Sequence, residues 1–388
     1  MNKAEESFAR QKSRALWMKE GDKNSKYFHG CMKDRINSNK ILSLELEDGS
    51  NKIFKPAEIH SAAISHFQSL FSSPSGRISV RDIDHLANRF LSPESSAELI
   101  KGVTDEEIRA VIFKMNPDKS PGPNGFTAGL FQQMWNVVGA DVCNAIKSFF
   151  ISGRLLKEFN CTAITLIPKS NSPSKMSDYR TISCCNIIYK SISGILAQRM
   201  KGLLPQLVSS AQSAFIPGRS IADNILLAQK ILRNYHKPTT QPRSIIKVDI
   251  LKAYDTVDWQ FLLGTLSSMG FPSTFTDWVR ECVTTPKFSI NLNGELVGFF
   301  GSSRGLSQGD PISSYLFVLV MEVLSMLIRH KVEQHTSSGQ SFQYHWRCSK
   351  TKITHLCFTD DLMLFVAGLS KVPKSFTKLS WSSPCYLG

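Results

Sequence analysis

Two adjacent aspartates, Asp360 and Asp361, are the residues of this sequence whose type and spacing most directly suggest chemistry. They lie between two apolar runs, 356–358 and 362–366. Neighbouring side chains of a strand point to opposite faces, so an Asp-Asp pair inside a buried strand would be very costly. We therefore predict a β-hairpin with both carboxylates at its tip. With a third carboxylate they could hold divalent cations for phosphoryl or nucleotidyl transfer, although aspartate is also a common turn residue.

Asp249 is the strongest candidate for that third carboxylate. It interrupts an apolar β run, 245–250, and a buried carboxylate needs a partner or a metal ion. The alternative is a residue that faces solvent from an edge strand. Tyr254 follows closely enough to line a pocket beside Asp249, and Asp258 is explained as the N-cap of the next helix.

A third segment, 305–314, leads into a long apolar helix. Glycines before a helix let a backbone approach a base or a sugar closely. Asp310 could cap the helix, with Pro311 at its first position. This explanation leaves Gln308 without a role.

Local patterns predict several further elements. Thr104 and Glu107 form a capping box for a helix that ends before Asn116-Pro117. Periodicity and turn residues place the others. They are strands at Cys161–Pro168 and Ser244–Leu251, and helices over Tyr189–Met200 and from about Asp258.

Composition restricts the class of protein. The 388 residues carry 46 Lys and Arg against 32 Asp and Glu, a net charge of +14, with 42% hydrophobic residues. A globular protein with this charge favours a polyanion such as nucleic acid, or is basic without such a partner. The nine cysteines include no C-x-x-C pair, which indicates free thiols in a reducing compartment and no zinc site.

Secretion and membrane insertion are both unexpected. The N-terminus has no apolar signal-peptide core. The longest apolar stretch, Tyr315 to Ile328, is too short for a membrane span and contains Glu322. We therefore predict an intracellular protein, of the nucleus or the cytoplasm. Residues 1–40 are basic with interleaved aromatics, and we expect a helix that either grips a phosphate backbone or is simply solvated.

Taken together, these blocks resemble reverse transcriptases of LINE-type (non-LTR) retrotransposons, particularly those of plants. KVDILKAYDTVDW is similar to the first palm motif of that family, GLSQGDPISSYLFV to its second, and FTDD to its catalytic hairpin. KSPGPNGF, LIPK, DYRTISCCNIIYKSISGILAQRM and SAFIPGRSIADN resemble the fingers motifs, in order. The resemblance runs from about residue 5 to about residue 368.

The resemblance implies roles for the matching residues. Asp249, Asp360 and Asp361 would hold two Mg²⁺ ions, with Mn²⁺ as a substitute. Lys169 and Arg180 would reach the incoming deoxynucleoside triphosphate. Other implied roles are a steric gate against ribose at Tyr254, contact with the templating pair at Gln308 and Gly309, and a template contact at Arg219. The implied partners are an RNA template and a DNA primer.

The resemblance also implies an α+β fold of right-hand polymerase fingers and palm, with an antiparallel palm sheet backed by helices. We expect an extension with a linker at 1–103, a fingers-like part at 104–243, a palm at 244–368 and a disordered tail at 369–388. No thumb, endonuclease or Cys/His knuckle is recognised. We therefore expect the second strand of the hairpin to have an exposed edge.

Three residues depart from the usual motifs of the family. Thr181 and Ser314 replace prolines, and Asn124 replaces an aspartate. These changes, with the missing thumb, leave a second hypothesis open: a retroelement remnant that binds nucleic acid without catalysis. An unrelated two-metal nuclease would leave Gln308 and Gly309 unexplained.

Overall fold

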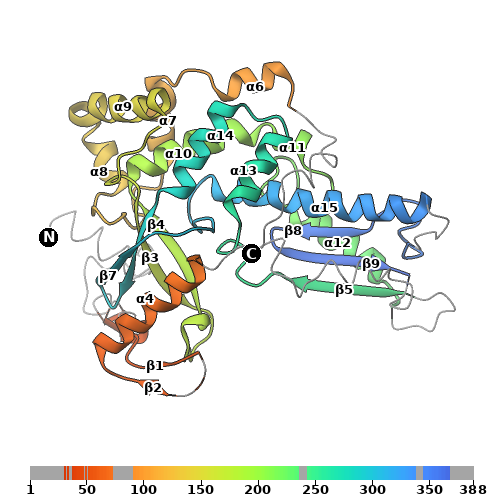
Figure 1. Cartoon of the computed structure of the whole chain (residues 1–388), viewed down its shortest axis with the longest axis horizontal. Coiled ribbons are helices and arrows are strands. Elements are labelled where there is room, and N and C mark those ends of the chain that lie inside the picture. Colours follow the sequence, from red (N-terminus) through yellow and green to blue (C-terminus); the bar gives the residue numbers. More distant parts are fainter. Residues whose placement is uncertain are drawn as a thin grey trace, which may run out of the picture. The chain divides into compact units, whose positions relative to one another are not determined.

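The computed structural model describes residues 30–72 (without 32, 35, 36, 48 and 50), 91–235, 243–337 and 344–367. The chain divides into two compact units, each assembled from separate stretches. Unit 1 consists of Met1–Leu70, Val103–Ile192 and Thr285–Ser302. Unit 2 consists of Phe71–Gly102, Ser193–Thr284 and Ser303–Gly388. Figure 1 follows the elements along the chain.

A four-stranded sheet forms the centre of unit 1. Its order is β4-β3-β6-β7. β3 and β6 pair in parallel, and the other two pairs are antiparallel. The parallel pair joins strands that are far apart in the sequence, which a hairpin cannot do. The strand bounds are Cys161–Pro168 for β3, Tyr179–Cys185 for β4, Lys287–Leu292 for β6 and Glu295–Phe300 for β7.

Helices cover this sheet and complete unit 1. α4 (Pro56–Ser72) lies against β7, where a Cβ on Gly298 would come within 2.9 Å of the Ile64 side chain. The remaining helices of the unit pack on one another. The short strands β1 and β2 lie near α4 instead, where His66 pairs with Glu47 of the β1–β2 connection (Figure 1). Their bounds are Asp105–Lys114 for α7, Ala128–Gln133 for α8, Trp135–Ser152 for α9, Leu44–Glu45 for β1 and Lys52–Ile53 for β2.

The Pro/Gly-rich loop of unit 1 is fixed by one buried asparagine. A Cβ on Gly122 would lie 2.4 Å from Oδ1 of Asn186, so only glycine fits there. Asn186 Oδ1 also accepts a hydrogen bond from the Asn124 N–H at 3.3 Å. Its Nδ2 donates to the carbonyl of Glu158 at 3.0 Å. The loop is thereby attached to the residue that precedes α10 (Ile187–Lys201), a helix that runs from unit 1 into unit 2.

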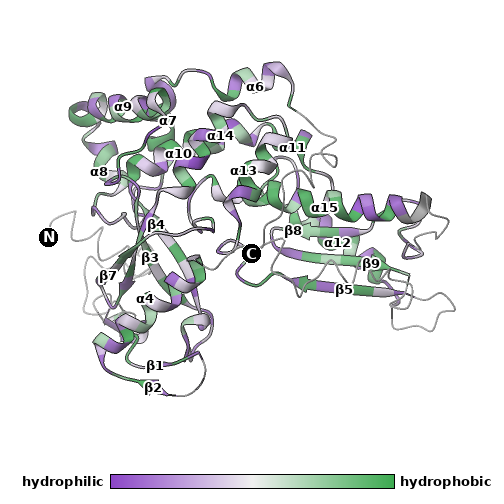
Figure 2. Ribbon diagram, viewed as in Figure 1, coloured by the Kyte–Doolittle hydropathy of each residue, from purple (hydrophilic) through white to green (hydrophobic). Residues whose placement is uncertain are grey.

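Unit 2 contains a three-stranded antiparallel sheet with β9 in the middle. Its order is β5 (Ser244–Asp249), β9 (Asp361–Val366) and β8 (His355–Phe358). One face packs on α12 (Ile221–Leu232), with Leu356, Phe365 and Ile231 in the shared core. The other face meets α15 (Ser313–Ser337), through a hydrogen bond between His355 Nε2 and the Ser325 hydroxyl. Figure 2 shows β9 coloured as hydrophobic along most of its length, as a strand covered on both faces requires.

The expectation of an exposed edge on the second hairpin strand is wrong. β9 is paired on both sides, by β8 and by β5. The sequence shows that a strand follows the Asp pair, but the pairing with β5 depends on a segment more than a hundred residues upstream. The outer side of β8 is also occupied, since Cys357 exchanges backbone hydrogen bonds with Ala211 and Ser213.

Among the described residues, four other helices belong to unit 2. α13 (Trp259–Ser268) and α14 (Ser273–Thr284) pack on each other, and α13 also contacts α15. α6 (Pro93–Leu99) is joined to α10, because the Arg199 guanidinium donates to the Leu99 carbonyl at 3.0 Å. The short helix α11 (Leu204–Leu207) precedes the loop that runs beside β8.

Most of the local predictions are confirmed. Thr104 caps α7 through a hydrogen bond from the Glu107 N–H, and Asp258 caps α13. The strand predicted at Cys161–Pro168 is β3, and the predicted helix over 189–200 lies within α10. The strand predicted over 244–251 ends two residues early, at Asp249.

The predicted domain boundaries are consecutive, and the two observed units are not. Residues 285–302, predicted within the palm, lie in unit 1 because β6 pairs with β3. Residues 193–243, predicted within the fingers-like part, lie in unit 2. The predicted basic helix in 1–40 lies largely, and the tail at 369–388 entirely, outside the described residues.

Two expectations from the composition, on cysteines and on membrane spans, can be compared with the described part of the chain. Its eight cysteines are all free, and five of them are buried. Within the same residues, no helix combines the length and the apolar character needed to cross a bilayer.

The buried imidazole of His355 should make the stability of unit 2 depend on pH. Burial, and then the charge of Arg329, lower its pKa from 6.5 to about 4. The folded state therefore disfavours protonation of His355. The contribution of the neutral imidazole to the free energy of unfolding is fully present above pH 6.5 and is lost as the pH falls towards 4. Between these limits we expect a loss of about 3 kcal/mol in the free energy of unfolding, measured by urea denaturation.

The variant His355→Gln should remove this dependence on pH. His330→Gln makes the same chemical change on α15, outside the β8 core, and is the matched control. An unchanged pH profile in His355→Gln would contradict the assignment.

Candidate active site

The predicted hairpin is confirmed, with the two aspartates at its tip. β8 ends at Phe358, which is paired with Asp361 at the start of β9. Thr359 and Asp360 form the two-residue turn between them. Thr359 has a φ of 56°, in the left-handed region that such a turn needs.

Asp249 and Asp361 are brought together by strand pairing. Asp249 is the last residue of β5 and is the direct cross-strand partner of Asp361. Directly opposite residues of antiparallel strands have Cα atoms about 4.5–5.5 Å apart and side chains on the same face. Both side chains are exposed at the end of the sheet, so Asp249 escapes burial inside the core.

Asp360, in the turn, is partly buried. Its partial burial raises its pKa above the usual aspartate value, and the charges of Asp361 and Asp249 raise it further. The electrostatic effect of both neighbours indicates that the three carboxylates share one small region of unit 2. A cation placed among them would relieve that repulsion.

The side chains are not gathered around a ready-made cation position. Among the described residues, no group of three or more His, Cys, Asp or Glu side chains is close enough to hold a metal ion. Asp361 instead forms an exposed ion pair with Lys247, at 3.2 Å between Nζ and Oδ1. The residues fit Mg²⁺ in ligand type, as hard carboxylate oxygens, and in backbone placement. Binding would require Asp361 to exchange Lys247 for the metal.

Tyr254 lies beside the aspartates, held by three contacts. Its ring stacks on Phe317 of α15, with centroids 4.5 Å apart. Its backbone carbonyl accepts the Leu306 N–H at 2.7 Å, which fastens it to the 305–314 segment. Burial raises the pKa of the phenol, a hydrogen bond with Ser314 opposes that rise, and the charge of Asp360 adds to it. The phenol is therefore neutral at neutral pH and near Asp360.

The 305–314 segment is exposed in its middle and buried where it enters α15. Gln308 and Gly309 are both exposed, and Gly309 has a φ of 113° that favours glycine. Asp310 is 5% exposed and accepts hydrogen bonds from the hydroxyls of Ser193 and Ser313. α15 begins at Ser313, two residues after the predicted first position at Pro311.

The two basic residues predicted to contact the triphosphate lie together in unit 1. Arg180 is exposed on β4 and is the cross-strand partner of Ile167 on β3. Lys169 follows directly after β3, and its ammonium donates to the Ser177 carbonyl at 2.8 Å. The β3–β4 pairing thus places both cations at one end of this hairpin.

Arg219 is occupied inside unit 2. Its guanidinium donates to the carbonyls of Val208, Ser209 and Gln212. These bonds hold the chain segment between α11 and α12. The predicted template contact of Arg219 remains a prediction, and the structure gives this side chain a structural role in addition.

Two residues that contact the hairpin were not identified from the sequence. The side-chain amide of Gln212 bonds the backbone of Thr359, and Asn224 Nδ2 donates to the Cys357 carbonyl at 2.9 Å. Both fall in the SAFIPGRSIADN block or just before it. The sequence could point to the block, but only the fold brings it beside the turn.

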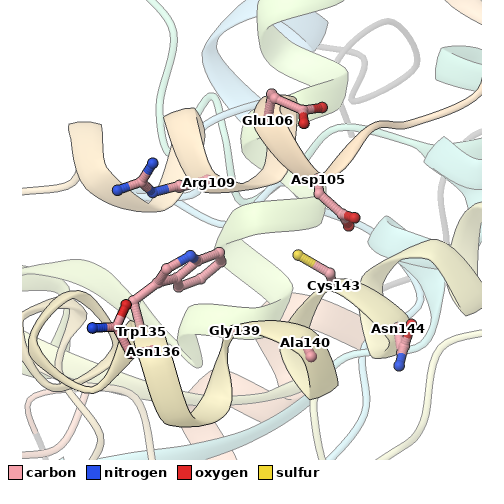
Figure 3. Close-up of a pocket in the computed structure, with 9 residues that line it drawn as sticks. All are labelled: Asp105, Glu106, Arg109, Trp135, Asn136, Gly139, Ala140, Cys143 and Asn144. Carbon is pink, nitrogen blue, oxygen red and sulfur yellow. The ribbon is translucent and has the colours of Figure 1, made fainter.

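A separate cavity in unit 1 contains none of the predicted site residues. It has a volume of about 450 Å³ and lies between α7 and α9, with Arg109, Trp135 and Cys143 in its wall (Figure 3). Burial and a hydrogen bond to Asp105 raise the pKa of the Cys143 thiol to about 11. The thiol is therefore protonated at neutral pH and is a poor nucleophile.

Comparison with known protein families shows to which family this chain belongs. Residues 167–381, more than half of the chain, match the family model described as reverse transcriptase (RNA-dependent DNA polymerase). The chain belongs to the reverse transcriptase family. The matched region includes every residue proposed from the motifs, from Lys169 to Asp361.

Individual relatives point to retrotransposons. The chain is 28% identical to the "Transposon TX1 uncharacterized 149 kDa protein" of Xenopus laevis, over 83% of this chain and 24% of the relative. It is 27% identical to the "Retrovirus-related Pol polyprotein from type-2 retrotransposable element R2DM" of Drosophila melanogaster, over 68% of this chain and 23% of the relative. A third match, 44% identical over 18% of this chain, covers 54% of the "Uncharacterized mitochondrial protein AtMg01250" of Arabidopsis thaliana.

These matches confirm the predicted resemblance to reverse transcriptases of non-LTR elements. The chain spans about a quarter of the length of the first two relatives.

The raised pKa of Asp360 predicts that its charge destabilises the metal-free protein. The folded state binds the Asp360 proton more tightly than the unfolded state does. Stability should therefore fall as the pH rises from the usual aspartate value of 3.8 through the raised one. Asp360→Asn should be more stable than the parent at pH 7 in the presence of a chelator, and this advantage should vanish in acid.

The measurement is chemical denaturation at several pH values. Asp277→Asn is the control, because it removes an exposed ion pair with Arg280. It should change the free energy of unfolding by no more than about 1 kcal/mol. A loss of stability at pH 7 in Asp360→Asn would refute the electrostatic account.

Proposed function

We propose that this chain is the RNA-directed DNA polymerase domain of a non-LTR retroelement, acting on an RNA template, a DNA primer and deoxynucleoside triphosphates. The observation that carries the proposal is the pairing of Asp249 with Asp361 beside Asp360, in a chain of the reverse transcriptase family. The net charge of +14 suits a polyanionic template and primer.

The three aspartates would hold two Mg²⁺ ions, or Mn²⁺ in their place. Bound divalent ions supply the acidification of the primer 3′-hydroxyl and the neutralisation of the triphosphate. Asp249 and Asp361 face each other across two strands, so both can present oxygens to the same ion. A bound cation would favour the ionised form of Asp360, which partial burial and the neighbouring carboxylates disfavour without one.

The remaining residues would bind and select the nucleotide. Lys169 and Arg180 would contact the triphosphate. The planar guanidinium of Arg180 presents paired N–H donors that suit two phosphate oxygens. The ring of Tyr254 would exclude a ribose 2′-hydroxyl. The exposed Gln308 and Gly309 would contact the templating pair, and Arg219 the template.

The domain assignment is part of this proposal. Residues 104–243 would act as the fingers-like part and 244–368 as the palm, with 1–103 as a basic extension. Unit 2 holds the aspartates, Tyr254 and the 305–314 segment, and would therefore supply most of the palm chemistry. Lys169 and Arg180 lie in unit 1.

One observation favours the second candidate function, nucleic-acid binding without catalysis. Asp361 is engaged by Lys247, and the described residues contain no assembled metal cluster. An exposed ion pair is worth little, about 0–1 kcal/mol, and a divalent ion can displace it. Salt-sensitive RNA binding that survives Asp249→Asn, without any nucleotide incorporation by the parent, would establish this alternative.

Primer extension on an RNA template tests the polymerase directly. With Mg²⁺ or Mn²⁺, the parent should add deoxynucleotides to the primer. Asp360→Asn should lower the rate on the order of 10²- to 10³-fold or more, because a ligand of the metal is lost. Asp141→Asn, an exposed aspartate on α9, is the matched control and should retain the parent rate. No extension by the parent, on several templates, would overturn the proposal.

Replacement of Tyr254 tests the steric gate. Tyr254→Val removes the ring, so the preference for deoxynucleotides over ribonucleotides should fall by about 10- to 100-fold in kcat/KM. Tyr254→Phe keeps the ring and should preserve the preference while losing the hydrogen bond with Ser314. Equal preferences in Tyr254→Val and the parent would assign the selection to another residue.

A further inference from the structure

The turn that carries the aspartates is strained at Thr359. Its φ of 56° lies in the left-handed region, which a β-branched side chain rarely adopts. Such a conformation is costly for this side chain and persists only where the surroundings hold it. Asp360 and Asp361 follow directly, so the directions of both carboxylates depend on this one backbone conformation.

The buried amide of Gln212 contacts this strained residue. Gln212 is 1% exposed. Its Oε1 accepts the Thr359 N–H at 3.1 Å, and its Nε2 donates to the Thr359 carbonyl at 3.2 Å. One side chain therefore pairs both backbone groups of the strained residue, as a neighbouring strand would. Oε1 also accepts the Ala214 N–H at 3.0 Å, which fixes the orientation of the amide.

The backbone around Gln212 is itself held in place. Gln212 forms a parallel bridge with Cys357 of β8. The Cys357 N–H donates to the Ala211 carbonyl at 2.7 Å, and the Ser213 N–H donates to the Cys357 carbonyl at 3.2 Å. The Arg219 guanidinium also donates to the Gln212 carbonyl, at 2.7 Å.

A buried carboxylate anchors the start of the same segment. Glu322 of α15 is fully buried, and its Oε2 accepts the N–H and the hydroxyl of Ser209 at 3.0 and 2.8 Å. Arg329 donates to the other oxygen of Glu322 at 2.7 Å. The segment 209–213 is thus fixed to α15, to Arg219 and to β8, and gives Gln212 a rigid base.

We propose that Gln212 is a positioning residue for the catalytic turn. Its amide holds Thr359 in the left-handed conformation and so sets the directions of the Asp360 and Asp361 carboxylates. The effect on the turn stands on contacts within unit 2, and its consequence for catalysis rests on the proposed polymerase function. The role needs both a donor and an acceptor at the end of a side chain of this length, which glutamine has and glutamate and methionine lack.

A merely structural Gln212 would stabilise the core without controlling the turn. The two roles differ in their response to glycine at position 359, since glycine adopts positive φ without strain. If Gln212 acts by holding Thr359, then Thr359→Gly should restore the turn after Gln212 is replaced. If Gln212 only contributes packing or hydrogen bonds to the core, glycine at the turn restores nothing.

The experiment compares Gln212→Met, Thr359→Gly and the double variant with the parent. The first readout is hydrogen–deuterium exchange in peptides that span 356–363, which needs neither metal nor activity. We expect Gln212→Met to speed exchange at the tip at least tenfold and the double variant to recover most of the protection. The second readout is binding of Mn²⁺, which should weaken about tenfold in Gln212→Met and recover in the double variant.

Gln132→Met is the matched control. The side-chain amide of Gln132 also donates to two backbone carbonyls, those of Ile112 and Met115. Gln132 lies in unit 1, whereas the turn lies in unit 2. It should leave exchange at the tip and Mn²⁺ binding unchanged. If Gln212→Met does not fold, Gln212→Glu keeps the acceptor for the Thr359 N–H and should give an intermediate loss, again restored by Thr359→Gly.

The outcomes separate the two proposals. Normal tip exchange in folded Gln212→Met, or a loss that Thr359→Gly does not restore, overturns the positioning role. A parent that adds no nucleotide, yet shows the expected exchange pattern, overturns the polymerase activity and supports the positioning role. Incorporation rates that follow the exchange pattern across the four proteins support both.

Discussion

The repulsion between three carboxylates held at the end of one small sheet is the constraint on which the rest of unit 2 depends. Like charges directly opposite one another destabilise a strand pair, and Asp249 and Asp361 are such a pair. The strands behind them must therefore supply enough apolar contact to hold the arrangement. β9 does so with a run of buried residues covered on one face by α12 and on the other by α15.

The same constraint explains why polar side chains gather behind the hairpin. Apolar packing can hold strands together, but it does not fix the backbone of a two-residue turn. Buried hydrogen-bonding groups can do so, provided that each is satisfied. Gln212 and Glu322 each have partners on more than one segment, and Arg219 donates to three carbonyls of the segment 208–212. They link the turn to α15 through backbone groups that would otherwise lack partners in a dry interior.

Sequence reasoning succeeded where the cause is local. The Asp-Asp hairpin could be predicted because burying the pair in a strand is costly, and the caps at Thr104 and Asp258 because their hydrogen bonds span three residues. Motif resemblance extended this success to Asp249, which lies over a hundred residues before its partner Asp361.

The failures concern contacts between distant segments. The central position of β9 and the division into two units follow from strand pairing across the chain, which no window of sequence reveals. Gln212 was missed for the same reason, since its partner Thr359 is 147 residues away. The template contact of Arg219 stays a prediction, and the motif gives no sign that backbone carbonyls also accept hydrogen bonds from its guanidinium.

The parallel pairing of β3 with β6 has a consequence for how the chain reaches this structure. The hydrogen bond from Asn160 to Thr285 joins residues 125 positions apart, at the start of that pairing. Between them lies the stretch Ser193–Thr284 of unit 2, and synthesis of the whole interval takes on the order of 10 s at typical rates. The β3–β4 hairpin therefore has one unpaired edge until α10 to α14, and then β6, have been synthesised. Sheet formation in unit 1 is expected to be a late event of folding, limited by closure of this long loop.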